Sequence, residues 1–172
     1  MPRHLAAVAL LALAACDRGP QVRPGDLDVV WRGAERGRFI APLEARHCAQ
    51  TGIVELLAIR GDTGVGAALF LKDSAIIEPT SYQVVPGSLL DEPRPGATAG
   101  ARWFATTSIS AFEGVAGTII LTLTGGVLTG TVDLKFQAID GPDTLRMLGT
   151  FSQVPVIVAD SGCRLIQKRN RM

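Results

Sequence analysis

A stretch of strict polar–apolar alternation over residues 128–138 constrains the fold more than any other part of the sequence. One set of alternate positions holds small or apolar residues, namely Leu128, Gly130, Val132, Leu134, Phe136 and Ala138. The positions between them hold Thr129, Thr131, Asp133, Lys135 and Gln137. Successive side chains of a strand point to opposite faces, so this period of two predicts a half-buried β-strand. We expect Val132, Leu134 and Phe136 to face the core.

Similar segments on both sides of this strand predict an antiparallel meander over residues 117–152. Apolar residues alternate with others before it and after it, at Ile119, Leu121, Leu123, Leu145, Met147 and Phe151. Gly125-Gly126 separates the first two strands, and glycines at both central positions permit the positive φ angles of a tight hairpin. Residues 140–143, with the sequence DGPD, predict the second turn.

The first half of the chain shows shorter and less regular strand patterns. The predicted strands cover residues 27–33, 37–42, 52–61, 65–73, 81–87 and 101–112. Residues 86–100 contain three prolines and three glycines, which predicts a long exposed loop. Short strands at this spacing are typical of an antiparallel β-sandwich or a β-barrel. We favour the all-β sandwich, because several strands are apolar on both faces, and keep the barrel as the alternative.

The N-terminus carries a short apolar run, Leu5 to Leu13, after Arg3. A membrane-spanning helix needs roughly 20 apolar residues, so this run is too short to cross a bilayer. A positive charge, a short apolar run and small residues at the end are typical of a secretory signal peptide. The small residues here are Ala12, Ala14 and Ala15.

The run ends in Leu13-Ala14-Ala15-Cys16, which resembles the lipobox of bacterial lipoprotein precursors. The resemblance covers residues 1–16 only and implies that the chain is cut before Cys16, which becomes lipidated. It also implies a place in the bacterial cell envelope, lipid-anchored to the inner or outer membrane, with the domain on the periplasmic or extracellular side. Stable attachment takes two or more acyl chains, which a lipoprotein has. The alternative is a plainly secreted protein in which Cys16 falls near the cleavage site.

These signals divide the chain into four parts. Residues 1–15 form the signal peptide, 16–26 the lipidated cysteine and a tether rich in Pro, Gly and charge, 27–166 the sandwich domain and 167–172 a basic tail. Removing residues 1–15 leaves 157 of the 172 residues and, without Arg3, 16 basic residues against 16 acidic ones. This balance argues against a nucleic-acid partner, which requires a basic face.

Two cysteines remain beside Cys16, namely Cys48 and Cys163. Exported proteins meet an oxidising compartment, in which paired thiols usually form disulfides. We therefore expect a Cys48–Cys163 disulfide that ties the early part of the domain to its end. Two buried free thiols are the alternative.

Residues suited to catalysis or metal binding are scarce after the signal peptide. His47 is the one histidine there. Most metal sites draw on several His or Cys ligands, and a Ser-His-Asp triad would depend on this single histidine as its base. We therefore expect His47 to be an ordinary surface or edge residue. The GDTGVG segment at residues 61–66 lacks the ending of a phosphate-binding loop and predicts a turn. Two pairs of carboxylates, Asp26 with Asp28 and Asp140 with Asp143, could bind calcium or exchange protons, but both lie at ordinary turn or tether positions.

The leading functional hypothesis is a membrane-anchored, non-catalytic envelope lipoprotein that binds a protein or an envelope polymer. The alternative is a β-sandwich lipoprotein that binds a small ligand, either a lipid or a sugar. An uncharacterised hydrolase is a distant third, because no nucleophile–base pair can be assembled. We expect no catalytic residues, no metal and no cofactor, and the residues that bind a ligand are unknown from the sequence.

Overall fold

The computed structural model describes residues 21–73, 76–87, 94–105 and 108–159, and these residues contain nine strands and no α-helix. The strands are β1 (Asp26–Gly33), β2 (Gly37–Cys48), β3 (Ile53–Arg60), β4 (Thr63–Phe70), β5 (Thr80–Val84), β6 (Gly96–Ala105), β7 (Ser108–Thr124), β8 (Val127–Ala138) and β9 (Thr144–Ala159). The predicted all-β class is confirmed.

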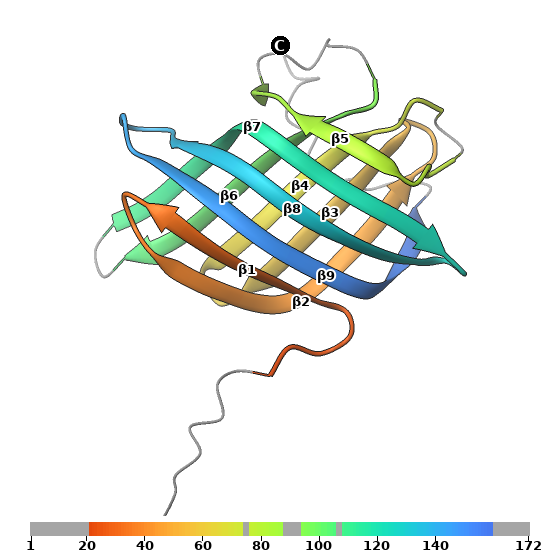
Figure 1. Ribbon diagram of the computed structural model, residues 1–172, viewed down its shortest axis with the longest axis horizontal. Helices are drawn as coiled ribbons and strands as arrows, with labels where there is room; N and C mark the ends of the chain where they lie inside the picture. Colours follow the sequence, from red (N-terminus) through yellow and green to blue (C-terminus); the bar gives the residue numbers. More distant parts are fainter. Residues whose placement is uncertain (1–20, 74–75, 88–93, 106–107, 160–172) are drawn as a thin grey trace, which may run out of the picture.

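Hydrogen bonds join all nine strands into one sheet in the order β1-β2-β3-β4-β6-β5-β7-β8-β9, and β9 pairs with β1 to close it into a barrel. In Figure 1, β7, β8, β9 and β1 lie side by side toward the viewer, with β3, β4 and β6 behind them. The favoured sandwich would have two separate sheets, whereas these strands form one closed sheet, which is the connectivity of the predicted alternative, the barrel. Some strands are apolar on both faces for a different reason. Cys48, Ile53 and Ala68 form a small second hydrophobic cluster apart from the main core.

Two strands are inserted between neighbours that otherwise meet directly. β1 lies between β2 and β9 and is antiparallel to both. Past the end of the barrel wall where β1 begins, β2 and β9 pair directly with each other in parallel, from Ala45 opposite Val156 to Cys48 opposite Ala159. β5 is inserted between β6 and β7, parallel to β6 and antiparallel to β7, and β6 and β7 pair directly with each other elsewhere along their length. The ring thus closes although its strands differ in length.

The meander predicted for residues 117–152 is confirmed as the end of β7 with β8 and the first part of β9. Gly125 and Gly126 have φ angles of 59° and 81°, as the tight turn requires. Val132, Leu134 and Phe136 are buried in the main core, while Lys135 between them is exposed.

Three of the predicted segments in the first half need correction. β2 continues past residue 42 to Cys48, because Pro42 lies where the pairing with β1 ends and pairing with β3 begins. Residues 96–100 belong to β6 and not to a loop. The segment 101–112 is not one strand but the end of β6 and the start of β7, which pair as a hairpin.

Side chains fill the inside of the barrel. At the end of the barrel where β1 finishes, Trp31, Trp103 and Phe112 stack with centroid distances of 4.8 Å for each neighbouring pair. The Trp103 indole Nε1–H donates to Glu35 Oε2 at 2.8 Å. Both tryptophans are buried, whereas Phe104, next to Trp103 in the sequence, is 51% exposed because it points to the other face of β6.

The one tyrosine of the chain gives a direct spectroscopic test of this core. Tyr82 on β5 is 1% exposed, and burial together with the charge of Glu78 raises its pKa to about 12. Because this pKa lies above the ordinary value of 10.0, the neutral phenol favours the folded state, and its contribution to stability is complete below pH 10 and is lost between pH 10 and about 12. We expect an ultraviolet titration to show phenolate forming near pH 12 in the folded protein. Ionisation near pH 10 without unfolding would contradict the buried position.

Candidate functional site

The predicted modification sites lie mostly beyond the part of the chain that the structure describes. Cys16, the predicted signal peptide, Cys163 and the basic tail are outside the described residues. Cys48 ends β2 and is 2% exposed. Both the lipidation of Cys16 and the Cys48–Cys163 disulfide therefore stay predictions.

His47 is not the surface or edge residue that we expected. It is 7% exposed, because β2 lies between β3 and β9 at this point and is not an edge strand. The register places His47 opposite Val54 of the main core, whereas Cys48 lies opposite Ile53 of the second cluster. The two neighbours thus face opposite sides of the sheet, so the histidine does not act on this thiol.

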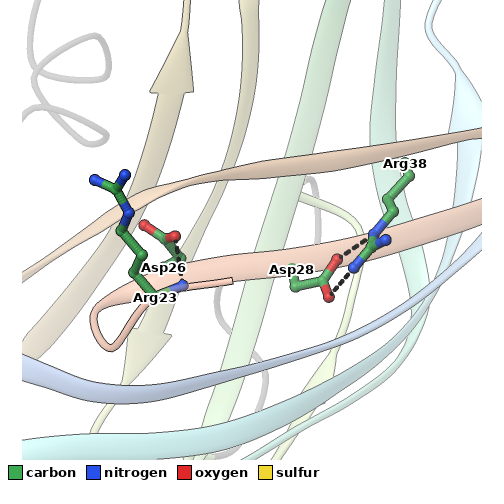
Figure 2. A network of polar contacts seen from close by, with 4 residues as sticks. All are labelled: Arg23, Asp26, Asp28 and Arg38. Atoms are coloured by element: carbon green, nitrogen blue, oxygen red, sulfur yellow. Dashed lines mark hydrogen bonds and ion pairs between the residues drawn. The ribbon is translucent and has the colours of Figure 1, made fainter. Parts of the chain in front are cut away.

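The carboxylates of Asp26 and Asp28 have separate structural partners (Figure 2). Asp26 is 8% exposed, and its Oδ2 accepts a hydrogen bond from the Arg23 backbone amide at 2.9 Å. Asp28 accepts two hydrogen bonds from the Arg38 guanidinium, at 2.9 and 2.8 Å. The pair fixes the start of β1 and does not form a shared acid–base or calcium site.

The other sequence candidates are turns. Gly61, with a φ angle of 56°, and Asp62 form the turn between β3 and β4, whereas the other four residues of the GDTGVG segment, 63–66, begin β4. Asp140 and Asp143 are exposed between β8 and β9. Within the described ranges, no group of three or more His, Cys, Asp or Glu residues is arranged to hold a metal ion.

The last residues of the predicted tether are fixed to the barrel. The Gly25 amide donates to the Ser152 carbonyl oxygen at 2.7 Å, and the Gly25 carbonyl oxygen accepts from the Leu43 amide at 2.8 Å. Gly25 therefore joins β9 to β2 at the point where β1 begins. The chain enters the domain at a defined end of the barrel.

The inside of the barrel holds little free space near this entry. An apolar cavity of about 20 Å³ lies among Leu27, Leu43, Leu56 and Phe151. This volume is about that of one water molecule, whereas a small ligand needs roughly 300 Å³ or more.

A groove of about 490 Å³ lies on the outside of the barrel, across β7, β8, β9 and the end of β1. We call it the cationic groove, and its lining includes Arg32, Lys135, Arg146, Asp133, Gly33 and Gly117. A Cβ atom at either glycine would collide with a carbonyl oxygen of the adjacent strand, that of Thr144 for Gly33 and that of Asp133 for Gly117. The two glycines therefore leave backbone uncovered in the groove.

Strand register brings the three cations into one row. Lys135 lies directly opposite Arg146, and Arg146 lies directly opposite Arg32 on the next strand. The Arg146 guanidinium donates to both carboxylate oxygens of Asp133, at 2.8 and 2.6 Å, and this contact lowers the pKa of Asp133 and raises that of Arg146. The lining side chains thus carry three positive charges and one negative charge.

Exposed apolar side chains continue the surface beside the cationic groove. Val30 and Leu148 lie directly opposite each other on β1 and β9, and they are 41% and 43% exposed. Leu148 is also opposite Asp133, so this apolar pair occupies the row next to the cations. The arrangement offers charge-assisted hydrogen bonds and apolar contact over one continuous area.

Sequence reasoning missed the cationic groove because its parts are distant in the chain. Arg32 and Arg146 are separated by more than a hundred positions, and each appears alone as an ordinary surface charge. The sequence did indicate one part of the groove, because the predicted meander places Asp133 and Lys135 together on the polar face of one strand.

Comparisons with known proteins do not assign this barrel to a family. No protein-family model, no protein of curated function and no solved structure matches the chain. Over the described residues, no helix has the length and apolar character needed to span a membrane.

Proposed function

We propose that the protein is a bacterial envelope lipoprotein, held in the membrane through Cys16, that binds a partner in the envelope without catalysing a reaction. The observation that carries this proposal is the contrast between the filled barrel interior and the cationic groove on its outside. The cavity that the described residues enclose around Leu27 and Phe151 has room for about one water molecule, which favours recognition through the outer surface. The small cavity also disfavours a lipid or sugar bound inside the sheet, which is one form of the small-ligand alternative.

The point of attachment supports the same function. The tether joins the barrel at Gly25, and the cationic groove begins at Arg32 and Gly33 at the other end of β1. Eight residues of strand separate these ends by about 25 Å. Residues 16–25 can extend by roughly 30 Å more. An anchor at Cys16 would therefore present the groove away from the membrane that holds the protein.

Replacement of the lipidated cysteine tests the anchor. We expect Cys16→Ser to abolish labelling with a radioactive fatty acid and to move the protein from the membrane to the soluble fraction. Cys48→Ser serves as the matched control, because it removes another cysteine and should leave labelling intact. Fatty-acid labelling of the Cys16→Ser protein, with retention in the membrane, would contradict the proposal.

A further inference from the structure

We infer that the cationic groove binds an acidic peptide segment of a partner protein, with the Val30–Leu148 pair contacting an apolar side chain of that segment. This inference rests on the proposed function and specifies the chemistry of the partner. Three features carry it, namely the charge of the groove, its size and the apolar surface beside it.

The charge of the groove comes first. Lys135, Arg146 and Arg32 are direct cross-strand neighbours, and like charges placed in this way destabilise a sheet. Asp133 pairs with Arg146, while Arg32 and Lys135 have no ion pair among the described residues. The net charge of the lining side chains matches a ligand with two negative charges, such as two carboxylates.

The contact of Arg146 with Asp133 shows that a carboxylate fits this surface. Both guanidinium–carboxylate hydrogen bonds form across neighbouring strands at short distances. Arginine presents a planar set of donors that matches a carboxylate in the same way. Arg32, in the same row, can bind a carboxylate of a partner in this geometry.

The apolar pair distinguishes a peptide from other anions. A free phosphate or a polyphosphate would use the cations and leave Val30 and Leu148 without a role. A peptide with carboxylates and an apolar side chain would use both rows. A lipid headgroup of the anchoring membrane is also disfavoured, because the groove lies at the opposite end of β1 from the tether.

A binding assay with defined probes tests the inference. The probes are a fluorescent decapeptide with four glutamates and two leucines, and the same peptide with glutamines in place of the glutamates. The purified full-length lipoprotein in neutral detergent is titrated against each by fluorescence anisotropy. We expect the glutamate peptide to bind and the glutamine peptide to bind at least about tenfold more weakly, with the difference shrinking as salt is added.

Charge-reversal variants locate the binding. Arg32→Glu with Lys135→Glu should weaken binding of the glutamate peptide by about tenfold or more, since two surface ion pairs are lost and two repulsions replace them. This variant places opposite charges beside Arg146, so the fold should be retained. The control, Arg60→Glu with Lys72→Glu, changes net charge equally at two exposed positions outside the groove and should stay within about twofold of the wild type.

Four results would overturn the inference. These are no binding of the glutamate peptide, equal binding of the two peptides, equal losses in the groove and control variants, and displacement of the peptide by inorganic phosphate at lower concentration than by unlabelled peptide. The labelling of Cys16 does not depend on the groove. Failed peptide binding with a lipidated Cys16 would therefore reject this inference alone, whereas a missing lipid would reject the proposed function.

Discussion

Phe136→Ala should lower the free energy of unfolding by about 3–5 kcal/mol, as expected for removing a large aromatic side chain from a packed core. Phe136 is fully buried on β8, the central strand of the meander, opposite Leu145 on β9 and Gly114 on β7. Few neighbours can move into the space, because the barrel holds both flanking strands in place. Equilibrium unfolding in urea measures the change.

The adjacent residue provides the control for Phe136. Lys135 is exposed on the same strand, so Lys135→Ala should change the free energy of unfolding by no more than about 0.5 kcal/mol. Similar losses at positions 135 and 136 would mean that the register of β8 is wrong.

Loss of the predicted disulfide should have a comparable effect. The parallel pairing of β2 with β9 places Ala159 directly opposite Cys48, and Cys163 follows four residues later. Four residues span at most about 14 Å, so Cys163 can reach the roughly 5.5 Å Cα separation that a disulfide requires. We expect Cys48→Ala and Cys163→Ala each to lower the free energy of unfolding by about 2–4 kcal/mol.

The double variant separates a disulfide from two independent buried thiols. If the two cysteines are linked, Cys48→Ala with Cys163→Ala should be no less stable than the worse single variant. Mass spectrometry of the unreduced protein should also find the two cysteine peptides linked. Alkylation of both thiols in protein purified without reductant would contradict the pairing.

The sequence predicted the meander well because its inward positions hold bulky residues and its outward positions hold polar ones. The first part of β6 was missed because the prolines and glycines of residues 86–100 favour a loop, and because its buried residues Ala97 and Ala99 are small and contribute little hydrophobic signal. Closure of the sheet depends on which distant strands pair, notably β1 with β9. The polar–apolar pattern of each strand does not contain that information.

The candidate site shows the same limit. Local motifs such as the GDTGVG turn and the lipobox can be recognised in short stretches of sequence. The cationic groove arises only when β8, β9 and β1 align Lys135, Arg146 and Arg32 in one row. His47 was misplaced because the parallel pairing of β2 with β9, which buries it, is also a long-range feature.

Photo-crosslinking in living cells tests most directly whether this anchored domain recognises a partner through its outer surface. A photoreactive amino acid replaces Leu148, beside the cationic groove, or Ile59, which is similarly exposed at 49% but lies on β3. The account predicts one discrete adduct with an envelope protein from position 148, absent from position 59 and lost with Arg32→Glu and Lys135→Glu. Equal adducts from both positions, or no adduct from position 148 in the membrane-bound protein, would contradict it.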